Sequence, residues 1–370
     1  MDINNNNNIV NLSNSILKNF GIEPFHNTIS EIDELLKSHK KVVVCLYDGL
    51  GKYIREKHNN VCKNLMKHRV HTMNSTFPPT TVAATTGFLT GKFPVENGWM
   101  SWTQYFEEYN CNINVFRNQR TSSGEIIRPR ENSILGEICP RKSIIDIINE
   151  TRGKKIAYDM SYFGNSFKGP KSLFLTRLKL TKLFKNKDEL FMYYYNAEPD
   201  HSIHWYGVND RHVKKLVKKF DRFTMKLAKK NKDILFIVIS DHGLIDVDYL
   251  DISKYPDLLS TLVENKPVSM EHRCPTFFVK EDRKEEFKNL FQKYFGEHFD
   301  LYSKQEVLDK KLFGEGNPNK YFDMFIGDFL AVSKDKYCII DSRGNDALIK
   351  GRHAGGTKEE MEIDISVFNK

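Results

Sequence analysis

The sequence predicts an α/β fold in which a mostly parallel central sheet is covered by helices on both faces. Four short apolar runs carry this prediction, and each is followed by a polar loop and then by residues with helical periodicity; they occupy residues 41–47, 155–158, 190–195 and 234–240. Apolar runs of this length are typical of strands buried on both faces. Their alternation with helices indicates three layers, with the sheet in the middle.

The elements are assigned in chain order. Residues 1–12, which include an asparagine run at residues 4–8, are expected to form a disordered lead. Residues 13–245 and 340–370 are expected to form the catalytic core. Within the core, apolar residues at 213–227 recur at helical spacing while lysines occupy the other face, which predicts a solvated helix more readily than a nucleic-acid surface.

Residues 246–339 differ in character and are predicted to form a smaller α+β cap inserted into the core. A strand is expected at 276–280 and a charged helix at 281–295. The chain then returns through an apolar run at 337–341 to a glycine-rich turn at 351–361.

The composition argues against membrane, secreted and nucleic-acid-binding proteins. No apolar run of about 18 residues and no secretory signal is visible, so neither a membrane partner nor secretion is expected. The six cysteines are widely spaced, which argues against disulfides and zinc knuckles and favours the cytoplasm. The net charge of +8 is spread along the chain, so no specific nucleic-acid binding is expected.

Candidate metal ligands follow the apolar runs. Asp48 follows the first run, Asp200 and His204 follow the third, and Asp241 and His242 follow the fourth. Parallel strands bring their carboxyl ends to one edge of a sheet, where sites form. A single aspartate after a strand is usually a turn or cap residue, but this set favours two divalent cations, one held by Asp48, Asp241 and His242 and the other by Asp200, His204 and His353.

A candidate nucleophile lies in the segment FPPTTVAATTGFLTG at residues 77–91. Its two threonines stand between a Pro-Pro break and a stretch of small residues that favours a helix. Free backbone N–H groups at a helix amino terminus stabilise an alkoxide or a phosphate oxygen. A threonine that merely caps the helix is the alternative.

Taken in order, these motifs resemble a known family. Asp48-Gly49, FPPTT, Thr90-Gly91, PDHSIH at 199–204, SDHG at 240–243 and the late His353 are similar to the type I phosphodiesterase and nucleotide pyrophosphatase branch of the alkaline phosphatase superfamily. The similarity spans about residues 41–245 and 340–370. It implies an alkaline phosphatase-like three-layer fold and a hydrolase of phosphodiesters or pyrophosphates.

The resemblance also implies roles for individual residues. Thr81 is the expected nucleophile and forms a phosphothreonine intermediate, while Thr80 is its neighbour. Zinc is the expected metal, with manganese or iron as alternatives. The implied ligands of the metal that activates the nucleophile are Asp48, Thr81, Asp241 and His242, and those of the other metal are Asp200, His204 and His353.

One position departs from the family pattern. Trp102 stands where the nucleotide branch has an asparagine that donates to a phosphate oxygen, so Asn97 or Gln104 is considered as the substitute. Trp99, Trp102 and Trp205 adjoin the ligand motifs and could stack on a nucleobase. Packing of the surrounding loops is the alternative for these rings.

Two other functions stay open at this point. One is a phosphomonoesterase or phosphonate hydrolase of the same fold. The other is a catalytically silent protein that binds metal or nucleotide. All seven ligand positions are filled, which favours an enzyme.

Overall fold

A six-stranded sheet forms the middle layer of the protein. The computed structural model describes residues 3–162, 173–185, 187–344 and 347–370. Five of the six strands run in one direction and β17 runs against them, in the order β2-β17-β8-β1-β7-β6. The predicted α/β fold is therefore confirmed. The strands are β1 (Lys41–Tyr47), β2 (Arg69–Asn74), β6 (Ala157–Tyr162), β7 (Leu190–Asn196), β8 (Leu235–Ile239) and β17 (Glu362–Phe368).

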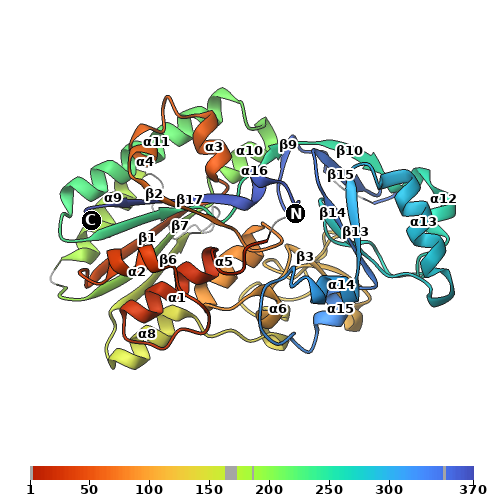
Figure 1. Ribbon diagram of the computed structural model, residues 1–370, viewed down its shortest axis with the longest axis horizontal. Coiled ribbons are helices and arrows are strands. Elements are labelled where there is room, and N and C mark those ends of the chain that lie inside the picture. Colours follow the sequence, from red (N-terminus) through yellow and green to blue (C-terminus); the bar gives the residue numbers. More distant parts are fainter. Residues whose placement is uncertain (1–2, 163–172, 186, 345–346) are drawn as a thin grey trace.

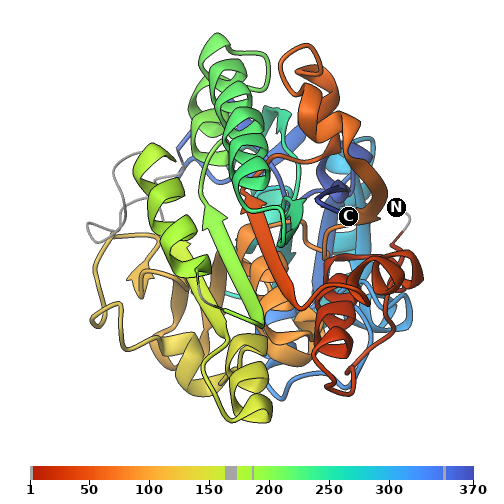
Figure 2. The same ribbon diagram turned by 90° about the vertical axis from the view of Figure 1, so that its left-hand side faces the viewer.

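The central strands are apolar on both sides because both faces of the sheet are covered. In β1 the side chains of Val43 and Cys45 enter one core cluster, and those of Val42 and Val44 enter the other. Figure 1 shows one set of helices above the sheet and another set below it, and Figure 2 shows the strands between them. The upper helices are α3 (Lys52–Lys57), α4 (Lys63–Lys67), α9 (Leu173–Phe184), α10 (Asp200–Tyr206) and α11 (Arg211–Lys230).

The lower layer begins at the amino terminus. It contains α1 (Ile9–Asn19), α2 (Ser30–Leu36), α5 (Thr81–Thr90) and α8 (Ile144–Arg152). The expectation that residues 1–12 are disordered is wrong from residue 3 onward, where the structure describes the chain. Asn8 caps α1 by accepting from the N–H groups of Val10 and Asn11. Asparagine is a favoured cap residue, and the buried Ile9 and Val10 begin the apolar face of the helix.

A second, antiparallel sheet lies beside the main one, in the order β11-β12-β14-β13. One face packs on α13, whose Phe287, Phe291 and Phe295 fill a separate core, while Leu330 and Val332 of β14 join the lower core. The predicted strand 276–280 corresponds to the overlapping β12, and the predicted helix 281–295 corresponds to a 3-10 turn followed by α13. The elements are β11 (Ser269–Glu271), β12 (Cys274–Phe277), β13 (Phe299–Ser303), β14 (Phe329–Ser333), α12 (Pro256–Leu259), α13 (Lys284–Phe295), α14 (Lys304–Asp309) and α15 (Phe322–Ile326).

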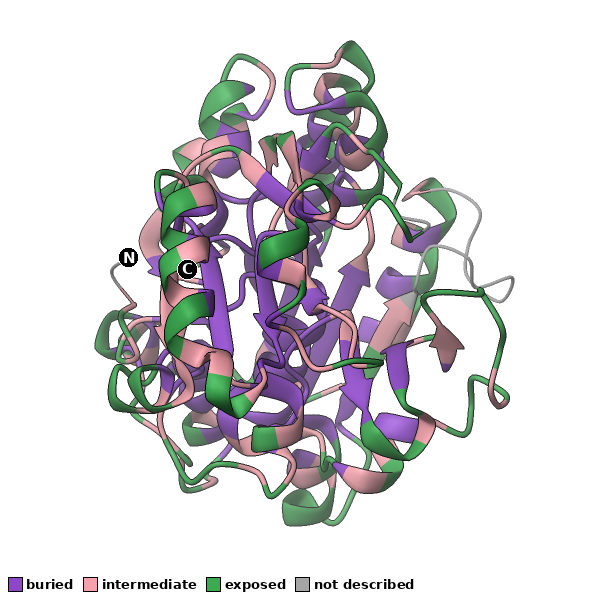
Figure 3. Ribbon diagram, turned by 90° about the vertical axis from the view of Figure 1, so that its right-hand side faces the viewer, coloured by how far each residue is buried: buried purple, intermediate pink, exposed green. Residues whose placement is uncertain are grey.

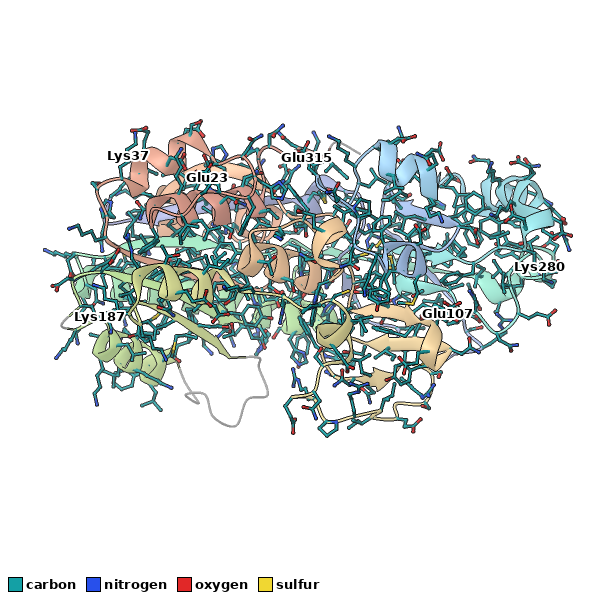
Figure 4. The ribbon with its side chains drawn as sticks, turned by 90° about the horizontal axis from the view of Figure 1, so that it is seen from below. Glu23, Lys37, Glu107, Lys187, Lys280 and Glu315 are labelled. Carbon is teal, nitrogen blue, oxygen red and sulfur yellow. The ribbon has the colours of Figure 1, made fainter. Side chains whose placement is uncertain are left out.

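Smaller elements connect these two sheets. The sequence did not indicate the three-stranded sheet formed by β3 (Thr103–Phe106), β4 (Cys111–Asn114) and β5 (Gln119–Arg120). In Figure 4, Glu107 after β3 and Lys280 after β12 lie in one half of the molecule, opposite Lys37 and Lys187. The other connecting elements are α6 (Pro94–Asn97), α7 (Ile134–Ile138), α16 (Lys358–Met361), and the strand pairs β9 (Ile245–Asp246) with β16 (Gly351–Arg352) and β10 (Asp248–Asp251) with β15 (Tyr337–Ile340).

The buried residues lie mainly between the layers. Figure 3 shows buried strands enclosed by helices and loops whose outer surfaces are exposed. None of the helices in the described part of the chain combines the length and hydrophobicity that a bilayer-spanning segment requires.

Candidate active site

Three neighbouring parallel strands bring the predicted carboxylates to one edge of the main sheet. β1 lies between β8 and β7. Asp48 directly follows β1, Asp241 follows β8, and Asp200 begins helix α10 after β7. Residues widely separated in the sequence therefore meet because their strands are adjacent and point the same way.

Gly49 allows the three loops to approach one another. Its φ of +69° lies in the left-handed region, and a Cβ atom there would stand 2.9 Å from the Asp200 Cβ. Its backbone N–H donates to Asp241 Oδ1 over 3.1 Å. A side chain at this position would separate the carboxylates that the site brings together.

Asp48, Asp241 and His242 form the first group. All three are buried, and their ligand atoms lie within 4.8 Å of one another. His242 Nε2 lies 3.4 Å from Asp48 Oδ1 and 3.5 Å from Asp241 Oδ2. Thr81 joins them, since its Oγ1 is 3.2 Å from His242 Nε2 and 3.4 Å from Asp48 Oδ2.

Asp200, His204 and His353 form the second group, with ligand atoms again within 4.8 Å of one another. His204 lies one helical turn after Asp200 on α10, so both side chains share a face, and Nε2 is 3.2 Å from Asp200 Oδ2. His353 comes from the glycine-rich turn, and its Nε2 is 3.9 Å from Asp200 Oδ1. The rings of His353 and His242 stack with centroids 3.9 Å apart, which places the two groups side by side.

The three histidines are held in the same way. The Nδ1 atoms of His204, His242 and His353 lie 2.7, 3.1 and 3.1 Å from the backbone carbonyls of Gly351, Gly243 and Pro79, respectively. A carbonyl only accepts, so each Nδ1 is the donor, and each Nε2 is left facing the carboxylates as the nitrogen that could bind a metal ion. In metal-ligating histidines, the ring nitrogen that does not bind the metal typically donates a hydrogen bond to a fixed acceptor of this kind.

The electrostatics of the site fit cations between the carboxylates. Burial, together with the charges of Asp241 and Asp200, raises the pKa of Asp48 well above its ordinary value. Burial likewise raises the pKa of Asp241 and lowers that of His353. Within the described residues, Asp200 Oδ1 and Asp241 Oδ2 are buried without a hydrogen-bond partner. Buried carboxylate oxygens of this kind are expected where a metal ion supplies the missing partner.

The comparisons with known proteins agree with this geometry. The family model for type I phosphodiesterase / nucleotide pyrophosphatase matches residues 42–357. The chain belongs to this family. It is therefore a hydrolase of the phosphodiesterase or nucleotide pyrophosphatase type, and family membership implies the use of divalent metal ions.

Solved structures share the family fold. Murine ectonucleotide pyrophosphatase / phosphodiesterase 5 superposes with a TM-score of 0.64 at 17% identity, covering 88% of this chain and 87% of that one. An inactive variant of the murine protein in complex with AMP gives 0.62 at 17% identity, with the same coverage of both chains. The human protein gives 0.61 at 15% identity and covers 89% and 87%. None of the curated protein sequences matches this chain significantly.

The predicted substrate contacts occupy different environments in this family member. Asn97 accepts from Trp99 N, and Gln104 accepts from Met100 N and donates to Gly98 O. The indole N–H of Trp99 donates to the carbonyl of Cys139. These local hydrogen bonds count against substrate contacts for Asn97, Trp99 and Gln104, whose role stays a prediction.

Two other predicted contacts retain accessible surface. Trp102 is half-buried and packs edge-to-face on Phe116. Trp205, directly after His204, is 56% exposed. Accessible aromatic faces are suited to stacking on a flat group of a substrate, and this role stays a prediction for both rings.

Four side chains around the site escaped the sequence prediction. The Tyr195 hydroxyl at the end of β7 donates to Asp48 Oδ2. Glu271 contacts the segment beside Thr81, and the buried Arg273 pairs with the buried Glu360. Only Tyr195 carried a usable signal, because its hydroxyl lies at the end of a strand next to the predicted ligands. The other three side chains make contacts that sequence spacing does not reveal.

Proposed function

We propose that the chain cleaves nucleotide-like phosphodiesters or pyrophosphates through a phosphothreonine on Thr81. One observation carries the proposal: the Thr81 hydroxyl lies 3.4 Å from Asp48 Oδ2 and 3.2 Å from His242 Nε2 in the first ligand group, and the ring of His242 stacks on His353 of the second group. Seven side chains from distant parts of the sequence converge in the arrangement that a two-metal phosphohydrolase needs.

Each of the two groups of ligands would hold one metal ion. Asp48, Asp241, His242 and Thr81 would hold one ion, and Asp200, His204 and His353 would hold the other. Two bound cations would neutralise charge on the attacking and leaving oxygens. Mixed oxygen and nitrogen ligands suit zinc, which we propose as the metal, and they also accept manganese or iron.

Thr81 supplies the attacking oxygen. Its Oγ1 forms a bond to phosphorus while the bond to the leaving oxygen breaks. Water then cleaves the phosphothreonine, which returns the threonine hydroxyl and releases the phosphoryl product. Thr81 begins helix α5, so the N–H groups of the first turn are in place to donate to a phosphate oxygen.

The proposed substrate class rests on two supports. The murine relative has been solved in complex with AMP. In this chain Trp205 is exposed and directly follows His204, and the half-buried Trp102 donates its backbone N–H to the same Glu271 oxygen as Thr80, the neighbour of Thr81. We further propose that residues 246–339 act as a cap over a core formed by 13–245 and 340–370, to which residues 3–12 also contribute.

We also propose a reducing compartment, the cytoplasm, as the location. All six cysteines are buried free thiols, and burial raises the pKa of Cys45 and Cys62 to about 12. Proteins of oxidising compartments more often pair their cysteines.

Turnover assays test the function. We expect bis(p-nitrophenyl) phosphate to be cleaved faster than p-nitrophenyl phosphate, with both activities lost on chelation and in Thr81→Ala. Elemental analysis is expected to find two metal ions per chain in the wild type. Full activity in Thr81→Ala or without metal would contradict the proposal, and faster cleavage of the monoester would favour a phosphomonoesterase.

A further inference from the structure

Glu271 of the second sheet reaches the segment that carries the nucleophile. A single carboxylate oxygen, Oε1, accepts from Thr80 Oγ1 at 3.1 Å, from Ser101 Oγ at 3.2 Å and from Trp102 N at 2.9 Å. Thr80 directly precedes Thr81. One acidic side chain therefore joins β11 to the start of α5 and to the loop before β3.

The bond from Thr80 to Glu271 orients a hydroxyl that at this position usually caps the helix. Thr80 is the N-cap of α5 and has extended backbone angles, φ −137° and ψ 149°. A threonine in this conformation normally accepts from the N–H of the second or third helical residue. Over the residues that the structure describes, its hydroxyl makes no such bond and donates to Glu271 instead.

The first turn of α5 consequently has backbone N–H groups that no described side chain caps. The helix runs from Thr81 for 10 residues. Among described groups, the N–H groups of Val82 and Ala83 have no hydrogen-bond partner, whereas the N–H of Ala84 already donates to the Thr80 carbonyl. Free N–H groups and the positive end of the helix dipole next to a nucleophile are suited to a phosphate oxygen.

The backbone around Glu271 is held firmly in place. Met270, which precedes it, is buried and has a φ of +66°, a conformation that large side chains rarely adopt without support from their surroundings. Arg273, two residues after Glu271, is anchored by a bidentate pair with Glu360 at 2.6 and 2.7 Å. The hairpin between β11 and β12 therefore presents Glu271 from a fixed backbone.

We propose that Glu271 is a positioning residue that withholds the Thr80 hydroxyl from capping α5 and so keeps the first-turn N–H groups available to substrate phosphate. The inference rests on the proposed function. Without Glu271, the Thr80 hydroxyl is free to turn and accept from the helix, and it then competes with the phosphate oxygen for the same donors. The effect on turnover passes through Thr80, which makes the idea testable by a second substitution.

A double-variant cycle on the metal-loaded enzyme tests the proposal. Glu271→Ala is expected to lower kcat/KM for bis(p-nitrophenyl) phosphate roughly tenfold, the size of one cap interaction, and to weaken inhibition by inorganic phosphate to a similar extent. Adding Thr80→Val removes the competing hydroxyl, so the double variant is expected to recover most of both losses. Glu271→Gln keeps an acceptor oxygen and is expected to retain more activity than Glu271→Ala.

Recovery is the decisive readout. If Glu271 only stabilises the fold, the second substitution removes another polar contact and lowers stability and activity further. A double variant no better than Glu271→Ala, or full activity in Glu271→Ala itself, would overturn the inference. An inactive wild type would instead overturn the proposed function, so the two failures are distinguishable.

A second pair of variants covers the case in which Glu271→Ala does not fold. Thr80→Asn introduces a strong cap acceptor, whereas Thr80→Val offers none. With Glu271 in place, Thr80→Asn is expected to be inhibited by phosphate more weakly than Thr80→Val. Equal inhibition of the two variants would also overturn the inference.

Discussion

Replacing Tyr195 by phenylalanine should weaken metal binding without disturbing the fold. The Tyr195 hydroxyl donates to Asp48 Oδ2, and the side chain is 3% exposed. Phenylalanine keeps the ring and leaves no large cavity, so the change removes only the hydroxyl and its bond to the carboxylate of Asp48, a proposed metal ligand. Partners of this kind orient ligands, and losing one typically costs about 10- to 100-fold in metal affinity or activity.

The size of the effect follows from the charge on the acceptor. A hydrogen bond to a charged group contributes about 1.5–3 kcal/mol. Because about 1.4 kcal/mol corresponds to a factor of ten, we expect Tyr195→Phe to weaken metal binding at the Asp48 group roughly 10- to 150-fold. Competition with a chelator of known affinity, followed by elemental analysis, measures this directly.

Tyr193 provides a matched control on the same strand. It is buried two residues earlier on the same side of β7, and its hydroxyl has no hydrogen-bond partner within the described parts of the chain. Tyr193→Phe makes the same chemical change and should leave metal affinity unaltered. Wild-type affinity in Tyr195→Phe, or equal losses in both variants, would refute the reasoning.

Three further predictions concern the surroundings of the site. Arg273→Met leaves the fully buried Glu360 carboxylate unpaired, so chemical denaturation should show a loss of about 3–5 kcal/mol, and adding Glu360→Gln should return part of it. Burial raises the pKa of Asp48 and Asp241 above the ordinary value of 3.8. The folded, metal-free protein favours the protonated form of both carboxyl groups, so their contribution to stability is fully present below pH 3.8 and is lost as pH rises through the raised pKa. Thermal unfolding with and without chelator should therefore show a metal-dependent gain in stability that grows with pH, and a gain that shrinks would contradict the assignment. Gly49→Ala should lower metal content and turnover together, because Gly49 has a φ of +69° and an added methyl group would collide with Asp200. Normal metal content in that variant would show that the loops can shift to make room for the methyl group.

The sequence was informative where local pattern and sheet geometry coincide. Asp48, Asp200 and Asp241 follow strands whose apolar runs are clear in the sequence, and adjacent parallel strands bring such residues together. His353 follows no such strand, and its assignment rests on its imidazole and on the resemblance to the family. The ordered start of α1 was missed because an asparagine run reads as low complexity even when its last member caps a helix.

Pairings between distant side chains could not be read from the sequence. Glu271 is 191 positions from Thr80, and Arg273 is 87 positions from Glu360. Neither acidic residue belongs to a periodic motif, and each acquires its role only when the second sheet packs against the core. The three-stranded sheet of β3, β4 and β5 was missed for a related reason, since strands this short carry little periodic signal.

The carbonyl of Pro79, two residues before Thr81, accepts from the ring of His353. This bond links the second ligand group to the main chain that carries the proposed attacking oxygen. The position of His353 relative to Thr81 is therefore set by a short stretch of main chain. Exchanging one divalent cation for another of similar size should therefore alter the rate through the acidity of the cation, while the spacing between Thr81 and His353 stays the same.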